Sequence, residues 1–121
     1  MVQQLRCGER TVNGATVVAL TGRLDIDTSP GLREVLLRHV KAGSTGLLVD
    51  MTEVEFIDSS GVATFIDAQL SLRGRGAGLV LFGLSPQTRD AFAMAKVADV
   101  FTLADDQRAA LAATMGQTGT G

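Results

Sequence analysis

The chain has little of what several classes of functional site require. Among its 121 residues there is one cysteine, one histidine, and neither tryptophan nor tyrosine. Cys7 alone excludes an internal disulfide, and with His39 it is too small a set for a standard zinc site. Five phenylalanines and scattered arginines offer no basic, aromatic surface for nucleic acid. We therefore expect no metal, no cofactor and no nucleic-acid partner.

Long hydrophobic runs are also missing. No apolar run approaches the roughly 18 residues that a membrane span needs, and the first residues do not resemble a signal sequence. Apolar residues make up 45% of the chain and charged residues 20%, with a formal net charge of −2. We expect a cytoplasmic domain over residues 1–114, taken to be a monomer with no membrane partner. A Gly- and Thr-rich tail at residues 115–121 is expected to be disordered.

Strand-like and helix-like segments alternate along the chain. Strands are expected within residues 2–12 and at residues 16–21, 47–51, 54–57, 79–82 and 100–103. Helices are expected after the Ser-Pro pairs at 29–30 and 85–86, and at residues 62–73 and 105–114. The Asn13-Gly14 pair predicts a tight turn after the first strand. This order predicts an α/β fold with a mostly parallel sheet and an antiparallel N-terminal strand.

Single residues set several of the expected boundaries and faces. Gly22 is expected to end its strand, and a polar link at residues 52–53 to separate two strands. Ser29, Ser85 and Asp105 are expected to cap the helices that follow them. Helical spacing places Leu70 and Ala95 on inward faces.

The polar motif Asp58-Ser59-Ser60-Gly61 connects a predicted strand to a predicted helix. A helix start needs only one capping side chain, which Asp58, Ser59 or Ser60 could supply. The motif has two hydroxyls, however, and Gly61 costs about 1 kcal/mol in a helix relative to alanine. Backbone N–H groups and the helix dipole at such a helix start favour anions. The motif therefore predicts a presented serine whose phosphate would be stabilised by the helix N-terminus.

A second polar loop follows the strand at residues 16–21. It contains Asp25 and Thr28, another acid and hydroxyl. The carboxyl ends of parallel strands meet at one edge of a sheet, and ligands bind there. We therefore expect this loop and the motif at residues 58–61 to share an edge.

Catalysis by the presented serine lacks support in the sequence. A nucleophile elbow reads G-x-S-x-G, but Ile57 stands at its first glycine, and His39 is the sole imidazole available as a base. The glycine-rich residues 73–78 match neither phosphate-loop pattern, and a helix cap followed by a turn explains them. We therefore assign no catalytic residue. A phosphate on Ser59 would come from another protein.

Two segments carry a resemblance to a known family. Residues 20–25 (Leu-Thr-Gly-Arg-Leu-Asp) and 56–61 (Phe-Ile-Asp-Ser-Ser-Gly) resemble the signature segments of STAS-domain anti-sigma factor antagonists. The resemblance covers residues 2–114 and implies about five strands and four helices. It implies that the unmodified protein binds an anti-sigma factor with serine kinase activity and frees a bacterial sigma factor. Phosphorylation by that kinase then ends binding, and a serine phosphatase restores it.

The resemblance also implies roles for individual residues. Ser59 would be the phosphoacceptor. The partner-binding surface would comprise Asp25, Thr28, Asp58, Ser60 and Gly61. Asp27 departs from the family pattern by adding an acid close to Asp25, and its contact with the partner is left open. The alternatives are a STAS subunit of a stressosome or of a lipid-transport ATPase complex, and a small serine-dependent hydrolase.

Overall fold

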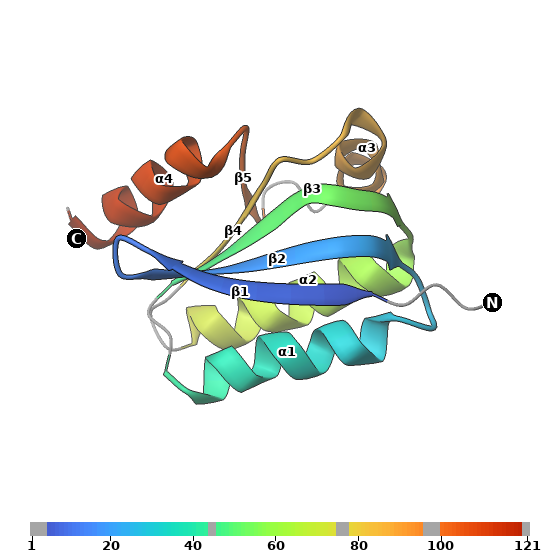
Figure 1. Cartoon of the computed structure of the whole chain (residues 1–121), viewed down its shortest axis with the longest axis horizontal. Coiled ribbons are helices and arrows are strands. Elements are labelled where there is room, and N and C mark those ends of the chain that lie inside the picture. Colours follow the sequence, from blue (N-terminus) through green and yellow to red (C-terminus); the bar gives the residue numbers. More distant parts are fainter. Residues whose placement is uncertain (1–4, 44–45, 75–77, 96–99, 120–121) are drawn as a thin grey trace.

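The computed structural model describes residues 5–43, 46–74, 78–95 and 100–119 (Figure 1). The strands are β1 (Arg6–Val12), β2 (Ala15–Leu24), β3 (Leu47–Ile57), β4 (Leu79–Phe82) and β5 (Thr102–Ala104). The helices are α1 (Ser29–Lys41), α2 (Ser59–Arg73), α3 (Pro86–Met94) and α4 (Gln107–Gly119). One five-stranded sheet has the order β1-β2-β3-β4-β5. Only β1 runs antiparallel to its neighbour, which confirms the predicted α/β fold.

The sheet separates two hydrophobic cores. Helices α1 and α2 lie side by side on one face (Figure 1), and Phe92 of α3 joins the same core. Successive residues of a strand point to opposite faces, so Val18 enters this core while Val17 enters a smaller one. The smaller core includes Ala110 of α4, which covers the other face of the sheet. Burial on both faces explains why the middle strands are so apolar.

Two expected strand ends were wrong. Gly22 does not end β2, because its φ of +120° lets the strand continue to Leu24 through a shift in its register with β3. Thr52 and Glu53 do not interrupt β3, which runs unbroken to Ile57. Both side chains are exposed, so a strand can carry them without burying polar groups. The polar side chains at residues 52 and 53 therefore belong to a part of the strand that faces solvent, and they do not end the strand.

Two expected helix caps were also wrong. Thr28 precedes α1 as its N-cap residue, and Ser29 is already the first residue of the helix. At α4 it is Asp106, not Asp105, whose Oδ1 accepts a hydrogen bond from the N–H of Ala109 at 2.9 Å. In each case the error is a single residue, within the precision of helix ends. Ser85 caps α3 as predicted, accepting from the N–H of the third helical residue.

The faces of two helices differ from the expected ones. Leu70 is 56% exposed, whereas its neighbour Gln69 is buried. Ala95 is exposed just after α3.

Helix α4 continues past Thr114 to Gly119. Among the described residues, no helix combines the length and the apolar character that a bilayer span requires.

Candidate functional site

The two polar loops meet at the carboxyl ends of β2 and β3. The backbone N–H of Asp58 donates to the carbonyl oxygen of Leu24 across 3.0 Å. In the β2–β3 ladder, Leu24 pairs with Ile57, so the chain leaves both strands at the same level of the sheet. The prediction that these loops share an edge is confirmed. The hydrogen bond joins them into one surface.

Asp58 is the cap of α2. Its backbone is extended, and its Oδ1 accepts from the N–H of Ser60 at 2.9 Å and from that of Gly61 at 3.3 Å. Of the three candidate caps, only Asp58 accepts these bonds in the described structure. Its carboxylate takes two of the N–H groups that a helix start offers. Stabilisation of a phosphate on Ser59 by the helix N-terminus stays a prediction, and in the unmodified protein two of these N–H groups are bound by Asp58.

Ser59 is the first residue of α2 and is exposed. Within the described part of the chain, no group hydrogen-bonds its hydroxyl. The following residue behaves differently, because the carbonyl oxygen of Ser60 accepts from the Thr64 hydroxyl at 2.9 Å and its N–H donates to Asp58. Of the two hydroxyl residues in the motif, Ser59 is the one that faces solvent most fully.

Gly61 brings the first turn of α2 close to the strands. A Cβ at this position would lie 2.7 Å from Ile57 Cγ1 and 3.0 Å from Leu24 Cβ. Carbon atoms in contact normally keep about 3.5 to 4.0 Å between them. Only glycine therefore lets the helix begin this near the ends of β2 and β3. Its contribution to the shape of the loop is a packing effect.

The second loop is held by its own side chains. Asp25 Oδ1 accepts from the N–H of Asp27 at 3.0 Å and from that of Thr28 at 3.2 Å. The Thr28 hydroxyl donates to the carbonyl oxygen of Arg23 at 2.7 Å and accepts from the N–H of Asp25 at 3.0 Å. Ile26 at the tip is 71% exposed. These bonds fix two acids and an aliphatic side chain at the shared edge.

Arg23 and Phe56 form a contact that sequence reasoning missed. They are paired across the β2–β3 ladder, and the guanidinium carbon of Arg23 lies 4.2 Å from the centre of the Phe56 ring. The same guanidinium approaches Asp25, with Nε 3.9 Å from Oδ2. Such stacking places a cation on an aromatic face. The pairing depends on the register shift at Gly22, which no local pattern indicated.

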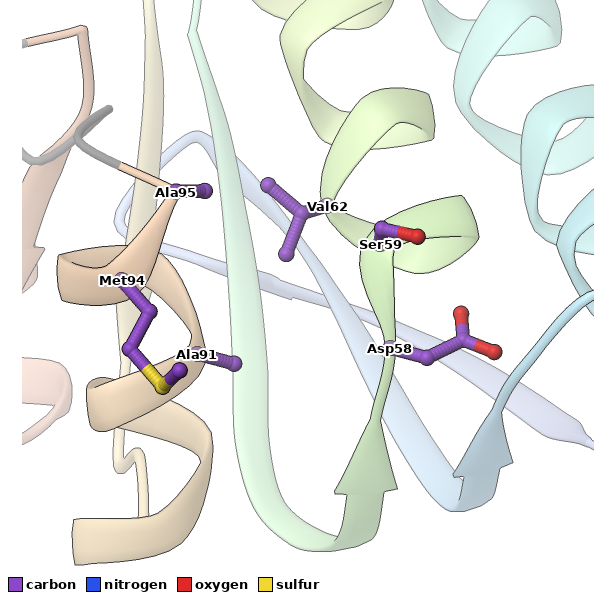
Figure 2. A pocket seen from close by; sticks show the side chains of 6 residues that line it. All are labelled: Asp58, Ser59, Val62, Ala91, Met94 and Ala95. Atoms are coloured by element: carbon purple, nitrogen blue, oxygen red, sulfur yellow. The ribbon is translucent and has the colours of Figure 1, made fainter.

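A groove opens between the start of α2 and the end of α3 (Figure 2). Its volume is about 320 Å³. It is lined by Asp58, Ser59, Val62, Ala91, Met94 and Ala95. The Met94 side chain is 83% exposed. No pattern along the chain indicates this groove, because it arises from the packing of two separate helices, α2 and α3.

The remaining reactive side chains lie elsewhere. His39 is in the last turn of α1, where its Nε2 lies 3.4 Å from Glu9 Oε2 of β1. The first turn of α1 starts at the shared edge, and ten residues of helix rise about 15 Å. Ser59 therefore has no imidazole beside it. Among the described residues, no group of three or more His, Cys, Asp or Glu side chains is placed to hold a metal ion.

Comparison with known proteins identifies the family. The STAS domain model matches residues 9–110. The chain belongs to the STAS domain family. This STAS domain is 37% identical over 87 residues to the anti-sigma-B factor antagonist of Listeria monocytogenes, covering 71% of this chain and 75% of that protein. The resemblance carried by residues 20–25 and 56–61 is thus confirmed at the level of the family.

Solved structures agree with the observed fold. The crystal structure of an anti-sigma factor antagonist from Mycobacterium paratuberculosis has a TM-score of 0.84 and 24% identity, covering 91% of this chain and 93% of that one. The anti-sigma factor antagonist SpoIIAA in its unphosphorylated form has a TM-score of 0.77 and 20% identity, covering 92% and 97%. At these identities the likeness shows that all three share the STAS fold.

Proposed function

We propose that this STAS domain is an anti-sigma factor antagonist that is switched by phosphorylation of Ser59. The unmodified form binds an anti-sigma factor with serine kinase activity in the cytoplasm and so frees the sigma factor. The kinase transfers the γ-phosphoryl group of ATP to Ser59 Oγ, with loss of the hydroxyl proton and release of ADP. A serine phosphatase hydrolyses the phosphoester and restores binding. The domain itself is a binding module and a substrate, not an enzyme.

One observation carries the proposal. The Ser59 hydroxyl is exposed and without a hydrogen-bond partner among the described residues, at the edge where two acidic loops are joined. A kinase can reach such a hydroxyl without any opening of the fold. The matching relatives are named as antagonists of anti-sigma factors, which supports the same role here.

The charges at this edge of the sheet explain why phosphorylation should weaken partner binding. A phosphoserine carries about −1.5 to −2 charges at neutral pH. It would stand next to Asp58, whose carboxylate already occupies the N–H groups of the helix start, and near the loop that holds Asp25 and Asp27. A partner whose surface fits the small neutral hydroxyl must desolvate this charge, which is costly wherever the contact supplies no hydrogen bonds to the phosphate. A loss of about 1.4 kcal/mol is a tenfold loss of affinity.

The other site residues divide into two roles in this proposal. Asp25 and Asp58 present charge to the partner and also hold their own loops through hydrogen bonds, and Asp27 adds a third carboxylate beside them. Thr28, Ser60 and Gly61 shape the two loops, through the hydrogen bonds and close packing described above. Substitution of the second group is therefore expected to act through the conformation of the loops.

The test combines labelling with a binding measurement. The purified protein is incubated with ATP and each kinase-type anti-sigma factor of the same genome, and phosphate is mapped by mass spectrometry. We expect label on Ser59 that is lost in Ser59→Ala and kept in the matched control Ser60→Ala. The phosphorylated protein should bind that kinase at least tenfold more weakly than the unmodified one. Label on Ser60, or equal affinity of the two forms, would contradict the proposal. Equal affinity would instead favour a docking subunit of a larger assembly.

A further inference from the structure

The groove beside Ser59 is an apolar surface that the phosphoswitch by itself does not use. Its walls are the side chains of Val62, Ala91, Met94 and Ala95, drawn from α2 and from the end of α3 (Figure 2). Met94 holds a large thioether side chain in solvent at 83% exposure. Well-packed apolar pockets of this kind are where a few residues supply most of the binding energy at protein interfaces.

We propose that the anti-sigma factor seats one apolar side chain in this groove, and that this contact senses whether Ser59 carries phosphate. The inference rests on the proposed function, because the partner must approach the Ser59 hydroxyl closely to phosphorylate it. Ser59 is itself a lining residue of the groove. A protein that covers this hydroxyl therefore also covers the mouth of the groove.

The groove also constrains the chemistry of its occupant. At about 320 Å³ it accommodates an aliphatic or phenyl side chain. Among the described residues that line it, Asp58 is the charged one, and the acidic loop with Asp25 and Asp27 is tied to the same edge. The complementary segment is an apolar anchor next to lysine or arginine.

A second copy of this chain fits the groove poorly. The exposed aliphatic side chain that the chain offers at this edge is Ile26, and it lies between Asp25 and Asp27. Docking it beside Asp58 would bring like charges together, which is unfavourable. The charges therefore favour a basic partner over self-association.

Phosphorylation would act on the groove directly. Because Ser59 lines the groove, a phosphate on it would add up to two negative charges beside the groove. An apolar side chain seated there would strip water from the phosphate and return no hydrogen bonds. The same side chain meets only a small neutral hydroxyl when Ser59 is unmodified. The groove thus couples the modification to the loss of an apolar contact.

The test compares three exposed or nearly exposed positions. Met94→Ala removes part of the groove wall, Ala95→Leu fills the groove, and Leu70→Ala is the matched control, an exposed truncation on α2 outside the groove. The probe is the kinase that labels Ser59 in the preceding experiment. We expect Met94→Ala and Ala95→Leu each to weaken its affinity roughly fivefold or more, as truncation of an interface anchor does. The affinity of Leu70→Ala for the kinase should stay within about twofold of the wild-type value, because Leu70 lies outside the groove.

The outcomes separate this inference from the proposed function. If the wild type is labelled on Ser59 but both groove variants bind like Leu70→Ala, the groove inference is overturned and the phosphoswitch stands. If no kinase labels Ser59, both are overturned. Unchanged thermal unfolding of the variants shows that affinity, not folding, was altered. A photo-crosslinker placed at Met94 should attach to an apolar segment of the kinase next to a basic residue. Its attachment to a second copy of the chain would contradict the inference.

Discussion

The backbone N–H of Asp58 donates to the carbonyl oxygen of Leu24 across 3.0 Å, tying the start of α2 to the end of β2. The serine that we propose as phosphoacceptor and the acidic loop at residues 25–28 therefore form one unit. Substitutions that disturb this junction should show in stability before they show in binding.

Gly61→Ala should destabilise the protein although alanine is the better helix former. The new Cβ would lie 2.7 Å from Ile57 Cγ1, and overpacking of this kind costs about 1 to 3 kcal/mol. The gain in helix propensity returns up to about 1 kcal/mol. Urea denaturation should therefore show a lower free energy of unfolding for Gly61→Ala than for the wild type. Gly31→Ala in α1 is the control, because its Cβ would meet nothing within 4 Å. It should stabilise slightly, and a shift of both variants in the same direction would contradict the packing argument.

Asp58→Ala and Asp58→Asn should differ. Alanine removes the oxygen that accepts from Ser60 and Gly61, and loss of an N-cap costs about 1 kcal/mol. Asparagine keeps an acceptor oxygen and removes the charge, so the free energy of unfolding should fall less. The matched reference is Ser85→Ala, which removes the side-chain cap of α3. Equal losses in the two Asp58 variants would show that charge, not hydrogen bonding, is what the cap contributes.

Gln69→Leu should be costly even though it places an apolar residue in a buried site. Gln69 Nε2 donates to the carbonyl oxygen of Val100 at 2.8 Å, and its Oε1 accepts from the N–H of Leu79 at 2.9 Å. Leucine would leave the N–H of Leu79 unpaired, at about 1 to 3 kcal/mol for a buried group, and would leave the Val100 carbonyl oxygen only the longer bond from Arg73 Nη2 at 3.4 Å. Calorimetry should show a lower melting temperature. Leu70→Gln, the converse change at the exposed neighbour, should be nearly neutral, and a neutral Gln69→Leu would contradict the hydrogen-bond argument.

Asp50 should make stability depend on acid pH. Burial opposes ionisation of its carboxyl, but hydrogen bonds from Thr52 and Arg10 outweigh that effect and lower its pKa below the ordinary 3.8. A lowered pKa in the folded state stabilises the fold above the unfolded pKa, and this contribution is lost as the pH falls through the folded value. Asp50→Asn should therefore be less stable than the wild type near pH 7. The difference in the free energy of unfolding between Asp50→Asn and the wild type should become smaller below about pH 4, near the ordinary pKa of the carboxyl.

The Asp50 measurement is unfolding by urea at pH values from neutral down to about 2, below the ordinary range of carboxyl pKa values. Asp105→Asn is the control, because the Asp105 side chain is 94% exposed and pairs with Arg89 only at 3.5 Å. Exposed pairs contribute little, so this variant should follow the wild type at each pH. A gap between Asp50→Asn and the wild type that stays constant into acid would contradict the assignment.

Sequence patterns predicted the features of the fold that depend on neighbours along the chain. The alternation of apolar strands and helices indicated an α/β sheet, and Ser85 before Pro86 located a cap correctly. The motif at residues 58–61 was placed at the correct edge of the sheet. Each of these follows from local chemistry, namely burial, capping and turn geometry.

The features that sequence reasoning missed arise from contacts across the chain. Thr52 was interpreted as a break because polarity alone does not say that one side of a strand faces water. Gln69 was not recognised as buried, since its partners Leu79 and Val100 come from other elements. The groove next to Met94 requires the ends of two helices to be placed first. The motif left the cap of α2 open among Asp58, Ser59 and Ser60, and the structure shows that Asp58 accepts from two N–H groups of the helix start.

The hydrogen bonds that hold the two loops have a consequence for the kinetics of association. The Thr28 hydroxyl and the Asp58 carboxylate fix the loops before any partner arrives. Ordering a mobile interface side chain costs about 0.5 to 1.5 kcal/mol of entropy on binding, and little of that cost remains here. In the proposed complex we therefore expect the encounter rate to be governed mainly by long-range attraction to the carboxylates of Asp25, Asp27 and Asp58, and so to fall as ionic strength rises.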